Sequence, residues 1–190
     1  MTIKGILTRT GPLGIREIDA FFIRHPNFDP GCCLTPHDFL RSQINRFSRA
    51  LVVLDHEGSG REHLSPDELS NSIRTTVERN GWQGRVEVIV LVPELEIWVW
   101  SQSPRVEREL GWAGASPTLR EWLTIEGFFV PDEAKPKRPK EALLKALEEK
   151  KIQRSASLYY KLAQTVGLSG CNDKPMAKLC ETLRTWFPAT

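Results

Sequence analysis

Two pairs of acidic side chains follow apolar runs in this sequence and are the residues best suited to chemistry. Asp55 and Glu57 come after Leu51–Leu54, and Glu94 and Glu96 come after a second run. In an extended backbone, residues two apart point to the same side, so each pair could present both carboxylates together. Clustered carboxylates repel one another, and Mg²⁺ is a usual partner that relieves this repulsion. Such a metal can orient a phosphodiester and activate water. The alternative is that these acids are solvated and only turn the chain where strands end.

The elements that must position these acids form a strand–helix–strand unit. Arg49–Glu57 is apolar and ends at the turn Gly58-Ser59-Gly60, which predicts a buried strand. Ser65-Pro66-Asp67-Glu68 is a capping box with proline at the first helical position, and Asn80-Gly81 is a stop signal. Val86–Val92 predicts the second strand. A helical connection of this length implies parallel pairing, which puts all four acids at one edge of the sheet.

The rest of the chain is predicted to be mainly helical. Before the first carboxylate strand we expect a short strand over Ile3–Thr8, a turn at Thr10–Gly14, a helix over Ile15–Phe22, a loop from His25 to Pro36 and a helix over Pro36–Phe47. After the second strand, Ile97–Trp100 could extend that strand, but we favour a short helix there, which would bury both tryptophans against the sheet. We also expect a short helix at Leu119–Leu123 and three closing helices over Lys140–Lys151, Ser155–Val166 ending at Gly167, and Lys174–Phe187.

The carboxylate motifs resemble those of a known fold family. Leu-Val-Val-Leu-Asp-His-Glu is similar to the D-x-D motif that ends a strand in TOPRIM domains, which occur in topoisomerases, primases and related nucleases. Together with Pro-Glu-Leu-Glu-Ile-Trp, Lys-Pro-Lys-Arg-Pro-Lys and Tyr-Tyr-Lys-Leu-Ala, it resembles a family of small TOPRIM-like proteins. These are often encoded beside an ATPase in prokaryotic anti-phage gene clusters, including methylation-associated defence systems.

The resemblance implies a fold class and a set of site residues. The expected fold is α/β, a TOPRIM-like (Rossmann-like) and mostly parallel sheet flanked by helices, with a core over residues 1–130 and a helical section over 131–190 packed on it as one compact domain. Asp55 and Glu57 match the metal-binding pair, and Glu94 matches the carboxylate before the tryptophan, with Glu96 beside it. Where TOPRIM proteins end their first strand with a glutamate before a glycine, this chain has Thr10-Gly11. Threonine cannot supply acid–base chemistry near neutral pH.

Positive charge is concentrated in one stretch of the sequence. The whole chain has 26 Lys and Arg against 24 Asp and Glu, yet residues 135–161 contain nine basic and three acidic residues. A basic stripe on helices is suited to a phosphate backbone, whereas charge runs are also common on solvated faces. The residues we expect to contact nucleic acid are Lys135, Lys137, Arg138, Lys140 and Lys161.

Cysteine usage and hydropathy indicate the cellular compartment in which the protein works. The vicinal pair Cys32 and Cys33 lacks the spacing of a zinc site, and no apolar run has the length of a membrane span. We therefore expect a cytoplasmic protein without membrane association.

Two functional hypotheses follow from the sequence. In the first, Mg²⁺ or Mn²⁺ held by Asp55, Glu57 and Glu94 cleaves DNA or RNA under the control of a partner ATPase or another defence subunit. In the second, the missing first-strand glutamate marks a binding or regulatory subunit that has no catalysis of its own.

Overall fold

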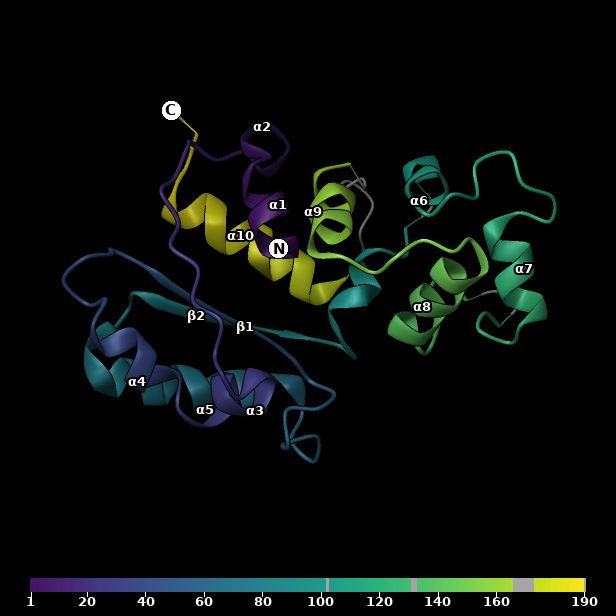
Figure 1. Cartoon of the computed structure of the whole chain (residues 1–190). Coiled ribbons are helices and arrows are strands. Elements are labelled where there is room, and N and C mark those ends of the chain that lie inside the picture. The colour runs from purple at the N-terminus through teal and green to yellow at the C-terminus, as the bar shows by residue number, and fades with distance from the viewer. Residues whose placement is uncertain (102, 131–132, 166–172, 190) are drawn as a thin grey trace. The chain divides into compact units, whose positions relative to one another are not determined.

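The computed structural model describes residues 1–101, 103–130, 133–165 and 173–189 and has an α/β architecture (Figure 1). The chain forms two compact units: a first unit of Met1–Ile15 and Glu96–Asp173, and a second unit of Arg16–Leu95 and Lys174–Thr190. This division differs from the expected boundary at residue 130, because the N-terminal segment joins the later helices and the last helix joins the sheet. The 3₁₀ helix η2 (Leu95–Trp98) lies at the boundary. Among the described residues, no helix has the length and hydropathy of a membrane span.

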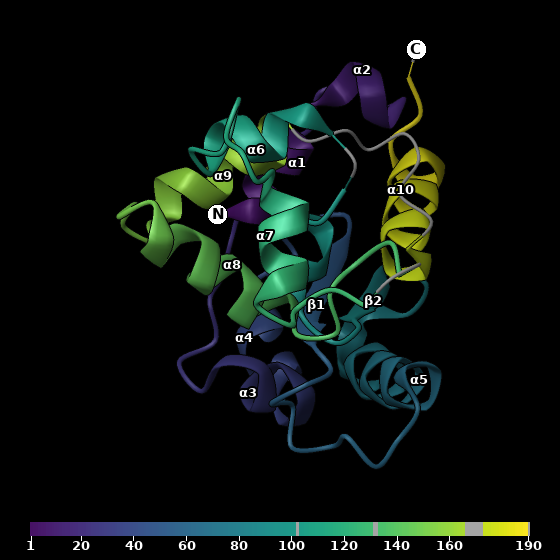
Figure 2. The same ribbon diagram turned by 90° about the vertical axis from the view of Figure 1, so that its right-hand side faces the viewer.

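The second unit is built on two parallel strands, β1 (Ala50–Asp55) and β2 (Val86–Leu91), as the sequence predicts. Ala50 pairs with Val86 and Asp55 with Leu91, so both strands end at the same edge. Helix α10 (Lys174–Trp186) covers one face, and α3 (Phe28–Leu34), α4 (Pro36–Arg41) and α5 (Pro66–Val77) cover the other (Figures 1 and 2). Alternate β1 side chains are buried.

The predicted connection between the strands is confirmed. The Ser65 hydroxyl accepts from the Glu68 N–H at 3.3 Å, and the Glu68 carboxylate accepts from the Ser65 N–H at 2.8 Å, so both ends of the capping box are closed. After α5 the chain continues through the short π-helix η1 (Glu78–Trp82). Gly81 there has φ of 97°, a conformation that lets the helix stop where Asn80-Gly81 predicts.

Side chains seal the outer edge of β2. The Val88 N–H donates to Glu87 Oε1 at 2.9 Å, and the Val88 carbonyl accepts from Ser70 Oγ at 3.0 Å and from Lys178 Nζ at 2.9 Å. Lys178 also pairs with Glu87 Oε1 at 2.9 Å. Because these groups satisfy the backbone that a third strand would use, they protect this edge and anchor α10 to the sheet.

The first unit is helical. It contains α1 (Thr2–Leu7), α2 (Thr10–Leu13), α6 (Pro104–Glu109), α7 (Leu119–Ile125), α8 (Pro139–Glu149) and α9 (Ala156–Thr165). Helix α1 packs against α9, where a Cβ on Gly5 would lie 2.7 Å from the Tyr160 carbonyl oxygen. Helices α6, α7, α8 and α9 lie close together (Figure 2), and their core contains the buried residues Trp100, Trp112 and Phe129.

Several sequence predictions for the N-terminal third are wrong. Residues 2–7 form a helix and no strand, because the Gly5 surface allows close packing against α9. The predicted turn at Thr10–Gly14 contains the short helix α2, and the predicted helix over Ile15–Phe22 is absent. The predicted loop from His25 to Pro36 contains α3, and the next helix ends at Arg41, before Phe47.

The closing helices and the tryptophan turn match the sequence predictions closely. Helices α7, α8, α9 and α10 begin and end within a few residues of the expected positions, and Leu95–Trp98 is helical. Helix α6 was not expected. The end of the α9 prediction at Val166 and Gly167 lies outside the described residues.

Candidate functional site

Asp55, the last residue of β1, forms hydrogen bonds with two neighbouring segments. Its Oδ1 accepts a hydrogen bond from the Leu95 N–H at 2.8 Å, and its own N–H donates to Asp29 Oδ1 at 3.1 Å. Asp55 therefore contacts both the segment that follows β2 and the first turn of α3. The carboxylate that the sequence suggests as a metal ligand accepts a backbone hydrogen bond in this structure.

Glu94 and Glu57 lie near the same edge in different environments. Glu94 is buried and directly precedes Leu95, whose N–H binds Asp55. Glu57 is exposed, and its N–H donates to the Pro93 carbonyl at 3.0 Å. The parallel sheet therefore brings the backbones of the two motifs together as predicted, although the Glu57 side chain extends into solvent.

Glu96 is a buried carboxylate in the first unit that binds Tyr159 and Arg154. The Tyr159 hydroxyl donates to Glu96 Oε1 at 2.7 Å, and Arg154 Nη2 lies 3.3 Å from the same oxygen. Arg154 Nε also contacts the Tyr159 hydroxyl oxygen at 3.1 Å. Burial, followed by the hydrogen bond to Glu96, raises the pKa of Tyr159 well above its ordinary value. Tyr159 therefore remains a neutral donor to a carboxylate that is only 4% exposed.

The four predicted ligands do not fit a preassembled magnesium site. Within the part of the chain that the structure describes, no three or more His, Cys, Asp or Glu side chains form a group that could hold a metal ion. Asp55 accepts a backbone N–H, Glu57 is exposed and Glu96 binds Tyr159 and Arg154. We therefore assign structural contacts to the Asp55 and Glu96 carboxylates.

The positions around the acids also have structural roles. His56 Nε2 hydrogen-bonds to the Leu64 carbonyl at 2.9 Å and so joins the two ends of the polar loop that follows β1. Thr10 begins helix α2, so it does not occupy a strand end as the TOPRIM glutamate would. The residue that the sequence matches to the TOPRIM glutamate therefore lies in a short helix.

The predicted nucleic-acid residues are largely paired with acids. Lys137 lies 3.4 Å from Glu133, and Lys161 lies 3.1 Å from Glu109. Arg138 binds Glu141 at 2.6 Å. Lys135 pairs with Asp173, and Lys140 is exposed at the start of α8. These ion pairs offset much of the local positive charge that the sequence suggests.

The vicinal cysteines contact the core of the second unit. Cys32 and Cys33 are free thiols that pack on it from α3. Burial, with added repulsion from Asp29, raises the pKa of Cys32 to about 11. Because the thiolate is the nucleophilic form, Cys32 is poorly reactive near neutral pH.

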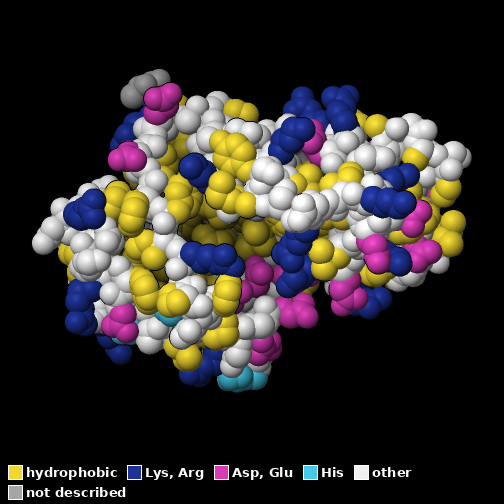
Figure 3. Space-filling model, viewed as in Figure 1, with side chains coloured by type: hydrophobic (Ala, Val, Ile, Leu, Met, Phe, Trp, Pro, Cys, Tyr) yellow, Lys and Arg dark blue, Asp and Glu magenta, His cyan; other side chains and the backbone are white. Residues whose placement is uncertain are grey.

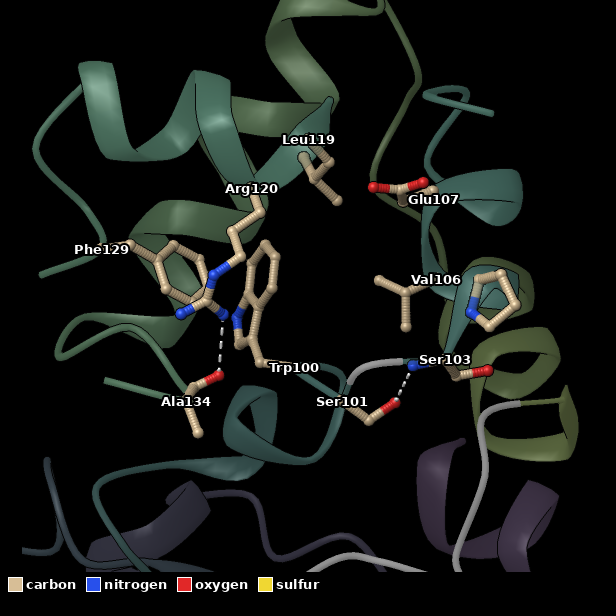
Figure 4. A pocket seen from close by; sticks show the side chains of 10 residues that line it. Trp100, Ser101, Ser103, Val106, Glu107, Leu119, Arg120, Phe129 and Ala134 are labelled. Atoms are coloured by element: carbon tan, nitrogen blue, oxygen red, sulfur yellow. Dashed lines mark hydrogen bonds between the residues drawn. The ribbon is translucent and has the colours of Figure 1, made fainter. Parts of the chain in front are cut away.

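A pocket of about 320 Å³ lies within the first unit (Figure 4). Trp100 and Phe129 form an apolar wall, and the Arg120 guanidinium lies 4.6 Å from the Phe129 ring centroid. Arg120 is also hydrogen-bonded to the carbonyls of Glu133 and Ala134. Val106 and Glu107 face this wall from the opposite side (Figure 4). The arginine is held as part of the wall by these contacts.

Comparisons with protein-family models, with curated proteins and with solved structures found no match for this chain.

Sequence reasoning did not identify the residues that hydrogen-bond to the predicted site acids. Asp29 was placed in a loop, where no periodicity indicates that α3 carries it to β1. Tyr159 lies 63 residues from Glu96, a separation at which no local pattern indicates contact. Only the tertiary arrangement identifies these pairs.

Proposed function

We propose that this chain is a nucleic-acid-binding subunit of a prokaryotic antiviral defence system, acting in the cytoplasm with a partner ATPase and without cleaving phosphodiesters itself. The defence setting and the ATPase rest on the motif resemblance of the sequence. The observation that carries the noncatalytic assignment is the engagement of Asp55 and Glu96 with protein donors. A carboxylate has about four lone-pair sites, and the hydrogen bonds to Asp55 and Glu96 leave fewer of these sites for a metal.

Nuclease assays test this proposal directly. The full-length protein would be incubated with single-stranded and duplex DNA and RNA, with Mg²⁺ or Mn²⁺, with and without the ATPase encoded beside it. We expect retention of nucleic acid without cleavage, both in the wild type and in Asp55→Asn. Asp67→Asn is the matched control, because it makes the same substitution at an exposed acid that neither hypothesis makes a metal ligand.

Phage protection by the same variants adds a cellular readout. We expect the folded Asp55→Asn variant to keep protection, because binding would be the contribution of this subunit. Metal-dependent cleavage by the wild type that disappears in Asp55→Asn would reject the binding-subunit proposal and favour the magnesium nuclease. Absence of nucleic-acid binding under all conditions would also reject it.

A further inference from the structure

A surface at the amino ends of the strands combines arginines with aromatic rings. We call it the arginine–aromatic surface and define it by Arg16, Phe21, Arg46, Phe47, Arg49 and Trp186. It is assembled within the second unit from the extended segment after residue 15, the residues before β1 and the end of α10 (Figure 1). Three segments that are distant in sequence therefore contribute to it.

Phe21 and Phe47 form a stacked pair. Their ring centroids are 5.9 Å apart with an angle of 12° between the planes, and Phe21 is 57% exposed. Arg46 Cζ lies 6.0 Å from the Phe21 centroid and 5.8 Å from the Phe47 centroid. The pair thus presents a flat, exposed ring with a guanidinium group beside it.

The contacts continue from β1 to the end of α10. Arg49 Cζ lies 5.5 Å from the Trp186 ring centroid, and the Trp186 and Phe187 centroids are 6.2 Å apart. Arg16 Cζ lies 5.4 Å from the Phe187 centroid, and the Arg16 N–H donates to the Phe187 carbonyl at 3.1 Å. Arg16, Arg49, Trp186 and Phe187 are therefore linked by ring contacts, and Arg49 follows Phe47 by two residues in the chain. Figure 3 shows Lys and Arg side chains beside hydrophobic ones on the left-hand part of the view, where these segments lie.

The arginines here differ from the paired cations of the first unit. Among the described residues, no Asp or Glu oxygen lies within 4.0 Å of a side-chain nitrogen of Arg16, Arg46 or Arg49. Arg49 instead donates to the Gly84 carbonyl at 2.8 Å, and Arg16 to the Glu17 carbonyl at 3.2 Å. Their positive charge is not cancelled by a contacting carboxylate, although Glu17 is close in sequence. The surface is complementary to a polyanion.

We propose that the arginine–aromatic surface binds single-stranded nucleic acid, with bases stacking on Phe21 and phosphates contacting Arg46 and Arg49. This inference rests on the proposed function and specifies its ligand class and location. Exposed rings are suited to the unpaired bases of a single strand, because paired bases are stacked within a duplex. Guanidinium groups within about 6 Å of the ring centroids could contact phosphates while a base stacks on the exposed ring.

Fluorescence anisotropy with a labelled single-stranded oligonucleotide and its duplex tests the proposal. We expect Phe21→Ala to weaken single-strand binding by at least about fivefold. A plot of log affinity against log salt concentration has a negative slope. Arg46→Ala should make this slope less steep by about 0.7, because one phosphate contact is lost. Both residues are exposed, so the variants should fold as the wild type does, which circular dichroism would verify.

Phe28→Ala is a matched control. Phe28 is also 57% exposed, with Arg24 Cζ 4.6 Å from its ring centroid. It lies near the other end of β1, because the next residue, Asp29, binds the Asp55 N–H. The strand from Ala50 to Asp55 extends roughly 16 Å at about 3.3 Å per residue. We expect Phe28→Ala to bind as the wild type does.

The outcomes separate this inference from the proposed function. Wild-type binding that is unchanged in Phe21→Ala and Arg46→Ala overturns the surface assignment and leaves the proposed function standing. Duplex binding as tight as single-strand binding, with the same sensitivity to Phe21→Ala, overturns the ligand class. No binding of either nucleic acid overturns both proposals.

Discussion

Replacing Tyr159 with phenylalanine should destabilise the first unit by about 2 kcal/mol. The substitution removes the hydroxyl that donates to Glu96 Oε1 at 2.7 Å and leaves the ring in place. A hydrogen bond to a charged group contributes about 1.5–3 kcal/mol to stability. Arg154 still lies 3.3 Å from the carboxylate, and its side chain is 48% exposed, so we expect only partial compensation.

Tyr160→Phe provides the control for this measurement. Tyr160 is the next residue on α9, and among the described residues none hydrogen-bonds to its hydroxyl. Urea unfolding followed by tryptophan fluorescence and circular dichroism would give the two free energies. We expect Tyr160→Phe to lie close to the wild type. If the two variants differed by less than about 0.5 kcal/mol, the Glu96 network would not stabilise the fold as argued.

The pH dependence gives a second check on the same network. The pKa of Tyr159 is raised in the folded state, first by burial and then by the hydrogen bond to Glu96. A raised pKa means that the stabilisation is fully present below the unfolded value of about 10 and is lost as pH rises above it towards the folded value. The free energy of unfolding of the wild type should therefore exceed that of Tyr159→Phe by a constant amount near neutral pH, and this difference should shrink in alkaline solution. An advantage that grew above pH ~10 would contradict this sign.

Two further predictions concern the second unit. Lys178→Met should destabilise it by about 1–2 kcal/mol, because the Lys178 ammonium binds Glu87, Ser70 and the β2 backbone. Lys174→Met, at the exposed first residue of the same helix, should cost little, and equal unfolding free energies for the two variants would reject the edge-sealing role. The ultraviolet thiolate absorbance that is lost in Cys32→Ser should titrate at pH of about 11, and a midpoint near the ordinary cysteine value would show that Cys32 is not buried as described.

Local signals in the sequence correctly predicted the two strands of the sheet and the helix that connects them. The apolar runs at Ala50–Asp55 and Val86–Leu91 form parallel strands, and the Ser65 capping box begins α5. These predictions succeed because each signal acts within one element: an apolar run favours burial, and a capping side chain satisfies amides one turn away. The same reasoning placed all four acids at one edge, and the structure brings Asp55 and the segment after Glu94 together there.

Tertiary contacts decided the remaining structure and the state of the candidate site. Residues 2–7 are short enough to suit either a strand or a helix, and packing of Gly5 against α9 selects the helix. A sequence shows that Asp55 and Glu96 are acids at strand ends, but it does not show which donors reach them. Leu95 and Tyr159 provide those donors only after folding, since hydrogen bonds between residues 40 and 63 positions apart depend on the arrangement of whole elements.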